Sequence, residues 1–162
     1  MNPCRILVVD DNTDIHRDFK RVIDTVNNAA SWSQLANDPL AEQQPISSVE
    51  PQFEFTSVTS GEAAVNAVRS AIARKRPFHV AIVDMRMPGL DGLATVEKLW
   101  TLQSDLQVAF SSAYMDYSWN SVITRLKRPG LRLVPKPWTG SEIIAILHEL
   151  RDRIRTRAPR SA

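Results

Sequence analysis

Short apolar runs alternate along the chain with longer stretches whose apolar residues recur at helical spacing. The runs lie at residues 6–9, 53–58, 79–83, 106–110 and 131–134. Each is followed by a stretch long enough to form a helix. Strands that alternate with helical patterns are typical of α/β proteins with a parallel sheet. The pattern therefore predicts five strands and five helices.

The expected helices carry their apolar residues on one face. In the first, between residues 15 and 26, the apolar positions are 4, 3, 1 and 3 residues apart, which is helical spacing. Thr13 is a candidate N-cap for this helix. The other four are expected at about residues 60–74, 92–102, 122–126 and 141–155.

Residues 27–52 interrupt this alternation. The segment contains three prolines and no Lys or Arg. Long loops inside compact domains are uncommon, so we interpret it as a loop-rich insertion between the first helix and the second strand, with a short helical turn anchored by Trp32 and Leu35. The rest forms one domain over residues 1–155, and residues 156–162 are a basic tail or the start of a linker.

The composition is that of an ordinary globular protein, with 43% hydrophobic residues and 20 Lys and Arg against 18 Asp and Glu. Cys4 is the single cysteine, which excludes an intramolecular disulfide and a cysteine-rich metal site. No run approaches the roughly 20 apolar residues of a transmembrane helix, and Met1 leads almost directly into the first strand instead of a signal peptide. We therefore expect a cytoplasmic protein without a membrane partner.

Arginines are concentrated near the end of the sequence, at positions 151, 153, 155, 157 and 160. A basic segment can bind nucleic acid, but cations also complement the macrodipole at the C-terminal end of a helix. No DNA-reading element accompanies these arginines. We favour the helix end and do not expect nucleic acid as a partner.

Polar residues follow four of the five apolar runs. Asp10 and Asp11 follow the first run, Asp84 the third, Ser112 the fourth and Lys136 the fifth. In doubly wound sheets the functional groups lie beyond the carboxyl ends of the strands, so the fold would gather these side chains at one edge. Each alone has an ordinary structural explanation, such as a solvated turn. Their placement at four strand ends favours a site.

The three carboxylates would repel one another unless a cation lay among them. Oxygen ligands select a hard ion, so Mg²⁺ is the expected cofactor. A lysine and a hydroxyl beside that cation suit phosphate oxygens. Asp84 is then the candidate nucleophile that attacks phosphorus and forms an aspartyl phosphate, with Lys136 offsetting the developing charge.

Four segments form a recognisable set: Val8–Asn12, Ile82–Gly92, Ser112–Ala113 and Lys136–Pro137. Together they resemble the receiver domains of two-component response regulators, most specifically in the Asp-Met-x-Met-Pro-x-x-Asp-Gly motif. The resemblance covers residues 4 to about 155, apart from the insertion. It implies a flavodoxin-like, doubly wound sheet of five parallel strands in the order 2-1-3-4-5 with five helices.

The resemblance also implies roles for the acidic residues. Asp84 matches the phosphoacceptor, Asp11 a direct metal ligand and Asp10 an acid that acts through a metal-bound water. The backbone carbonyl of Arg86, two residues after the acceptor, would be the third protein ligand of the metal. These four residues with a bound Mg²⁺ form the expected metal site.

Three further positions match the family's phosphoryl-handling residues. Ser112 stands where the family more often has a threonine whose hydroxyl moves toward the phosphoryl group. Ala113 is small, as close approach to that group requires, and Lys136 matches the lysine that pairs with the acceptor. The resemblance implies a cis peptide bond between Lys136 and Pro137.

The sequence also departs from the family pattern. Leu133 occupies a position three residues before the lysine where receivers usually carry Tyr or Phe, so an aromatic rotamer switch is not available there. Arg86 and Tyr114 are expected to tune the lifetime of the phosphoryl group together with Ala113. Residues 113–119 and the insertion resemble a receiver subtype found in hybrid sensor kinases and cyclic-dinucleotide signalling proteins.

The expected function is that of a phosphoacceptor in a two-component phosphorelay, phosphorylated by a histidine kinase or a phosphotransfer protein. It would be a signalling domain and not an enzyme, apart from its own phosphorylation and dephosphorylation. The output partner, a fused effector domain and homodimer formation are left open. The alternatives are a degenerate receiver acting as a constitutive binding module, kept open by Leu133, and a haloacid-dehalogenase-like phosphohydrolase, although Asp84-Met85-Arg86 lacks that family's second acid.

Two more side chains lie near these motifs. His16 falls within the first expected helix, and we interpret it as a helix-surface histidine because phosphodonor histidines belong to a helical-bundle context. Trp138 follows Lys136–Pro137, at a place where a partly exposed aromatic ring can anchor a partner.

Overall fold

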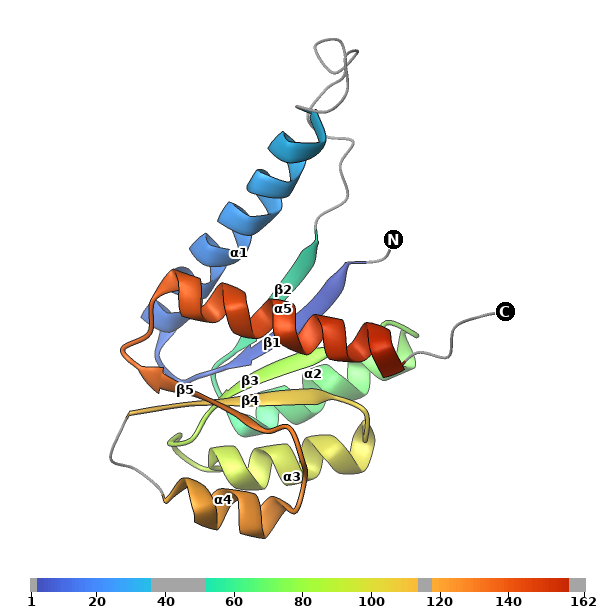
Figure 1. Ribbon diagram of the computed structural model, residues 1–162. Helices are drawn as coiled ribbons and strands as arrows, with labels where there is room; N and C mark the ends of the chain where they lie inside the picture. Colours follow the sequence, from blue (N-terminus) through green and yellow to red (C-terminus); the bar gives the residue numbers. More distant parts are fainter. Residues whose placement is uncertain (1–2, 36–51, 114–117, 158–162) are drawn as a thin grey trace.

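The computed structural model describes residues 3–35, 52–113 and 118–157 (Figure 1). Its centre is one parallel sheet with strands in the order β2-β1-β3-β4-β5, as the resemblance implied. The strands are β1 (Cys4–Val9), β2 (Phe53–Val58), β3 (Val80–Asp84), β4 (Gln107–Ala113) and β5 (Arg132–Lys136). Five strands thus lie close to the five apolar runs of the sequence.

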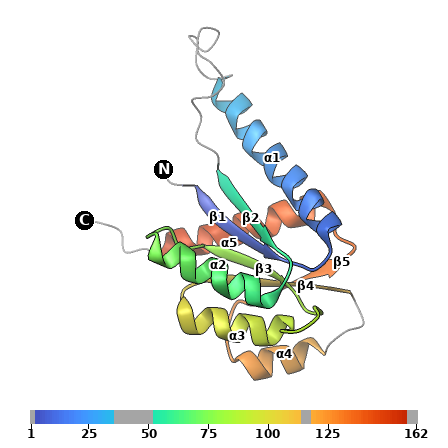
Figure 2. The ribbon, with the colours of Figure 1, turned by 180° about the vertical axis from the view of Figure 1, so that it is seen from behind.

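Helices follow the strands in strict alternation. They are α1 (Thr13–Leu35), α2 (Gly61–Ala73), α3 (Gly92–Leu102), α4 (Trp119–Leu126) and α5 (Gly140–Arg157). Helices α1 and α5 cover one face of the sheet, and α2, α3 and α4 lie on the other (Figures 1 and 2). Because both faces are covered, the central strands are buried on both sides, and all five residues of β3 are buried.

The side chains of successive strand residues point to opposite faces, so the sheet separates two hydrophobic clusters. Leu7 and Val9 of β1 belong to the cluster under α2 and α3. Ile6 and Val8 belong to the cluster under α1 and α5, together with Phe19. This double burial fixes the register of β1, because a shift by one residue would exchange the two sets.

Helix α1 is longer than the sequence pattern predicts. It continues to Leu35, so residues 27–35 are helical and do not form the start of a loop. This stretch contains neither Pro nor Gly to end the helix. The Asn27 side chain also bonds the start of the stretch to β2, because its amide donates to the Phe53 carbonyl (2.9 Å) and accepts from the Phe53 N–H (3.0 Å). Residues 36–51 of the expected insertion lie outside the described residues.

The N-terminal end of α1 also differs from the prediction. The cap is Asn12, whose Oδ1 accepts the backbone N–H of Asp14 at 2.9 Å, whereas Thr13 is the first helical residue. Asn is among the best N-cap residues because its short side chain reaches the free N–H groups of the first turn. The turn between β1 and α1 is therefore held from within its own sequence.

Within residues 3–35, 52–113 and 118–157, no helix is long and apolar enough to cross a membrane. Helix α5 ends at Arg157, two residues beyond the predicted domain boundary. Residues 158–162 of the expected tail lie outside the described part of the chain.

Candidate functional site

The carboxyl ends of β1, β3 and β5 bring three acids and a lysine together at one edge of the sheet. Asp10, Asp11 and Asp84 each place a carboxylate oxygen within 4.8 Å of the others. The Lys136 ammonium donates to Asp10 Oδ2 at 2.7 Å and to Asp84 Oδ1 at 2.9 Å. Four of the five polar residues that follow the apolar runs thus form one cluster.

Two of the three acids are buried, so the charges of this cluster interact strongly with one another. Asp10 and Asp84 are 2% and 7% exposed, whereas Asp11 is exposed. Burial raises the pKa of the Asp84 carboxyl; the hydrogen bond and charge of Lys136 oppose this, and the charges of Asp10 and Asp11 add to it. The net effect is a carboxylate that is less stable in its charged form than one in water.

The lysine responds in the opposite sense to its own burial. Desolvation alone would lower the pKa of the Lys136 ammonium, but the hydrogen bonds and charges of Asp10 and Asp84 outweigh it and hold that pKa above its ordinary value. Lys136 is therefore a fixed positive charge at neutral pH, placed between two carboxylates.

Asp10 is held at several of its atoms. Its Oδ1 accepts the backbone N–H of Asn12 at 2.9 Å, and its Oδ2 accepts from Lys136. Its backbone carbonyl accepts from Nε2 of His16 at 2.7 Å. The sequence pattern predicts a helix-surface histidine at position 16, but the residue is only partly exposed and its ring reaches back to this edge of the sheet.

The loop after Asp84 carries the Arg86 carbonyl that the resemblance assigns to the metal. Met85 and Met87 anchor the loop in the core, at 2% and 8% exposure, while Arg86 between them is exposed. Gly92 closes the loop: its N–H donates to the Met85 carbonyl at 3.1 Å. A Cβ on Gly92 would lie 2.3 Å from the Asp84 carbonyl oxygen, so the close approach requires glycine.

The hydroxyl and the small residue lie at the end of β4. Ser112 is 6% exposed, and its Oγ donates to the carbonyl of Ala113 at 3.0 Å. Ala113 is exposed and pairs with Lys136 across β4 and β5. Tyr114 lies outside the described residues. Leu133, at the position of the family's aromatic residue, is 38% exposed.

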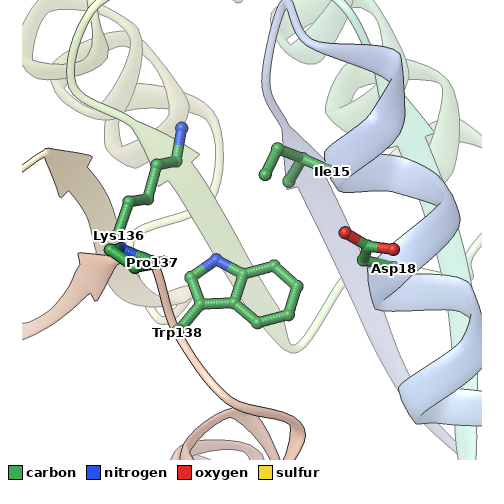
Figure 3. A pocket seen from close by; sticks show the side chains of 5 residues that line it. All are labelled: Ile15, Asp18, Lys136, Pro137 and Trp138. Carbon is green, nitrogen blue, oxygen red and sulfur yellow. The ribbon is translucent and has the colours of Figure 1, made fainter.

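A hollow of about 350 Å³ lies beside the lysine, between α1 and the segment that joins β5 to α5 (Figure 3). Its lining residues are Ile15, Asp18, Lys136, Pro137 and Trp138. The Trp138 ring is partly buried because it packs on Phe19, with ring centroids 4.7 Å apart. The Lys136–Pro137 peptide bond is cis, as the resemblance implied.

The donor set fits a hard divalent cation. Three carboxylates and one ammonium give the cluster a formal charge of −2, which a divalent cation would neutralise. The candidate ligand atoms are oxygens, and such ligands select Mg²⁺-type ions over soft metals. A cation at this edge would lie next to the Asp84 carboxylate and the Lys136 ammonium.

The fold and this edge define the class of the molecule: a doubly wound α/β protein with clustered acids and a lysine at the carboxyl ends of its strands. A family model of the response regulator receiver domain matches residues 41–148. The chain therefore belongs to the response regulator receiver domain family, a family of two-component signalling domains. The matched segment contains Asp84, Ser112 and Lys136 and begins after β1, so Asp10 and Asp11 precede it.

A characterised relative aligns with part of the chain. The DNA-binding transcriptional regulator NtrC of Salmonella typhimurium is 30% identical over 82 residues, which is 51% of this chain and 17% of NtrC. The chain thus corresponds to a small part of that relative's length.

Solved structures share the fold at low sequence identity. A signal receiver domain of a putative Luxo repressor protein from Vibrio parahaemolyticus has a TM-score of 0.66 at 17% identity, covering 96% of this chain and 95% of that chain. A receiver domain protein from Clostridium thermocellum has a TM-score of 0.66 at 17% identity, with 94% and 98% covered. The CheX–CheY–BeF3–Mg²⁺ complex from Borrelia burgdorferi has a TM-score of 0.65 at 14% identity, with 92% and 90% covered.

Proposed function

We propose that this receiver domain accepts a phosphoryl group on Asp84 in a Mg²⁺-dependent reaction. The observation that carries the proposal is the Lys136 ammonium, which bridges Asp84 and Asp10 within a cluster of three carboxylates. A lysine held at this point can neutralise phosphoryl oxygens as soon as they arrive. Asp84 is the acid of the cluster that lies in the family's matched segment.

Residues of the chain supply the main parts of the transfer. A carboxylate oxygen of Asp84 attacks phosphorus while the bond from phosphorus to the donor nitrogen breaks, and the electron pair of that bond stays on the donor histidine. Lys136 moves its hydrogen bond from Asp84 to a phosphoryl oxygen. The Ser112 hydroxyl turns from the Ala113 carbonyl and donates to another phosphoryl oxygen.

Asp11, Asp84 and the backbone carbonyl of Arg86 would hold the metal, together with Asp10 acting through water. When bound, Mg²⁺ supplies positive charge that offsets the phosphoryl oxygens in the transition state. The Borrelia burgdorferi CheX–CheY complex, which shares the fold, contains BeF3 and Mg²⁺, and this supports the choice of Mg²⁺ as the metal. Arg86, Ala113 and Tyr114 tune how long the phosphoryl group survives hydrolysis.

The phosphodonor is a histidine kinase or a histidine phosphotransfer protein. The hollow beside Lys136 offers such a partner an apolar wall, made by Ile15 and Trp138, directly next to the lysine (Figure 3). An aromatic ring that is half buried against Phe19 is already ordered before binding, and such rings often contribute most to affinity. The hollow therefore suits a helix that carries the phosphohistidine.

The new charge on Asp84 shifts a conformational equilibrium that an output partner or a fused effector domain reads. Leu133 lacks a ring to swing inward, so this shift has to pass through the end of β4 and helix α4. Only Val122 of α4 is buried, and Trp119 packs edge-on against Phe110 of β4, with centroids 6.2 Å apart. Helix α4 is thus lightly held and linked to the strand that carries Ser112.

Beryllofluoride, a phosphoryl mimic, tests the proposal without a partner. We expect the two-dimensional NMR spectrum of the wild type to shift on addition of beryllofluoride with Mg²⁺, and not without Mg²⁺. The Asp84→Asn variant should show no shift, because the fluoride complex needs a carboxylate oxygen. A wild type that ignores the mimic would contradict the proposal and favour a constitutive binding module.

A further inference from the structure

His16 contacts the backbone of the candidate metal site, although it is not one of the proposed metal ligands. It lies in the first turn of α1, and its Nε2 donates to the backbone carbonyl of Asp10 at 2.7 Å. The ring is partly buried, so the hydrogen bond is sheltered from competing water. A bond of this length between a ring N–H and a carbonyl oxygen is short and well formed.

The contact acts on the peptide unit between the two acids. The carbonyl of Asp10 and the amide nitrogen of Asp11 belong to one rigid plane. Fixing the carbonyl oxygen therefore fixes the orientation of that plane. The Cα atoms of Asp10 and Asp11, from which the two side chains leave the backbone, lie in the same plane and are placed with it.

The two acids depend on this contact to different degrees. Asp10 has further restraints, since its carboxylate is buried and bonded to both Asn12 and Lys136. The Asp11 side chain is exposed and makes no hydrogen bond within the described parts of the chain. Its position is therefore set by the backbone alone, and the His16 bond lies on the peptide unit that precedes it.

We infer that His16 is a positioning residue for the metal site, holding the Asp10–Asp11 peptide so that Asp11 points at the cation. Mg²⁺ demands nearly ideal octahedral geometry and tolerates misplaced ligands poorly. Groups that orient metal ligands from outside the coordination shell typically change metal affinity by about 10- to 100-fold when removed. The inference rests on the proposed function, because it presupposes Mg²⁺ binding at this edge.

Three substitutions separate the N–H donor from the rest of the ring. His16→Ala removes the donor. In His16→Gln the amide nitrogen lies three bonds from Cβ, as Nε2 does in histidine, so it can reach the carbonyl. In His16→Asn the amide nitrogen lies only two bonds from Cβ, so the side chain is too short to reach the Asp10 carbonyl. His148→Ala is the matched control, because His148 is also partly buried but lies against Phe53 at the other end of the sheet, with ring centroids 5.6 Å apart.

The experiment measures the dissociation constant for Mg²⁺ by isothermal titration calorimetry and the stability of each variant by urea unfolding. We expect His16→Ala and His16→Asn to bind Mg²⁺ about tenfold more weakly than the wild type. His16→Gln should remain within about twofold of the wild type, and His148→Ala should lose stability without losing Mg²⁺ affinity.

Two results would overturn the role of His16 while leaving the proposed function intact. One is Mg²⁺ affinity within about twofold of the wild type in both the alanine and asparagine variants. The other is an equal loss in all three His16 variants, which would show that the ring's shape matters and its N–H does not. A wild type that binds no Mg²⁺ would instead contradict the proposed function, and this inference with it.

Discussion

Replacing Lys136 with methionine would remove the charge that holds Asp10 and Asp84 together while keeping most of the length of the side chain. The ammonium lies 2.7 and 2.9 Å from the two carboxylates, whose side chains are 3% and 9% exposed, and its own side chain is 22% exposed. Breaking a buried ion pair by removing one partner typically costs about 3–5 kcal/mol. Because Lys136 retains some solvent contact, we expect the lower end, about 3 kcal/mol of unfolding free energy, in the absence of Mg²⁺.

The loss should depend on pH and on Mg²⁺ in a defined direction. Burial raises the pKa of Asp84, and without Lys136 that pKa rises further. The folded state then takes up a proton more readily than the unfolded state, so the penalty is full above the raised pKa and shrinks as the pH falls through it. Saturating Mg²⁺ should recover part of the loss, because the cation replaces the missing positive charge.

Urea unfolding followed by circular dichroism, with EDTA or with Mg²⁺, measures this loss. The matched control is Lys20→Met, since Lys20 pairs with Asp24 at the same 2.7 Å distance but with side chains 64% and 54% exposed; exposed pairs contribute at most about 1 kcal/mol. In the double variant Lys136→Met with Asp84→Asn, we expect a smaller loss than additivity predicts, because only Asp10 is then left charged without its cation. Equal losses for Lys136→Met and Lys20→Met, or strict additivity in the double variant, would refute the reasoning.

Three other predictions concern His79 just before β3, Gly92 beside the site and Glu97 on the surface. Burial lowers the pKa of His79, and its Nδ1 accepts a backbone N–H at 2.8 Å, so folding favours the neutral ring. The wild type should therefore lose stability relative to His79→Ala as the pH falls below about 6.5. Gly92→Ala should destabilise the protein by about 1–3 kcal/mol in urea unfolding and slow phosphorylation of Asp84 by acetyl phosphate, because the new Cβ would lie 2.3 Å from the Asp84 carbonyl oxygen. Glu97→Gln should cost less than about 1 kcal/mol of unfolding free energy in the same assay. Arg125 donates two 2.9 Å hydrogen bonds to the Glu97 carboxylate, but both side chains are largely exposed to solvent.

Each of these predictions has an outcome that would contradict it. If the unfolding free energies of the wild type and His79→Ala change with pH in parallel, folding does not favour the neutral imidazole of His79. If Gly92→Ala keeps the stability and the acetyl phosphate labelling of the wild type, the loop after Asp84 can shift to accommodate the new Cβ at little cost. A loss above about 2 kcal/mol in Glu97→Gln would mean that the bond between α3 and α4 is worth far more than a surface pair.

The elements and the acidic cluster can be predicted because both depend on short-range pattern. The apolar runs of β1 and β3 are buried on both faces, so their sequences are nearly continuous in Val, Ile and Leu. Parallel strands share a carboxyl edge, so the residues that follow the runs meet wherever the strands are neighbours. The grouping of Asp10 and Asp84 at that edge therefore follows from the neighbouring strands β1 and β3. Lys136 follows β5, which neighbours only β4, and its long side chain reaches the two acids along the same edge.

Other features depend on contacts that no local pattern contains. The extension of α1 to Leu35 is fastened by Asn27, whose amide bonds the backbone of Phe53 across 26 residues. The contact of His16 depends on the rotation of α1 about its axis relative to the end of β1, because the ring reaches the Asp10 carbonyl only when position 16 faces it. A histidine in the first turn after an acidic pair is a signal in the sequence, but the direction of its ring is not.

Labelling with acetyl phosphate, read by intact mass, tests the central claim most directly. The account predicts a single phosphoryl adduct on the wild type that requires Mg²⁺ and is absent from Asp84→Asn. An adduct that persists in Asp84→Asn, or one that forms equally well with EDTA, would contradict the assignment of Asp84 as the Mg²⁺-dependent phosphoacceptor.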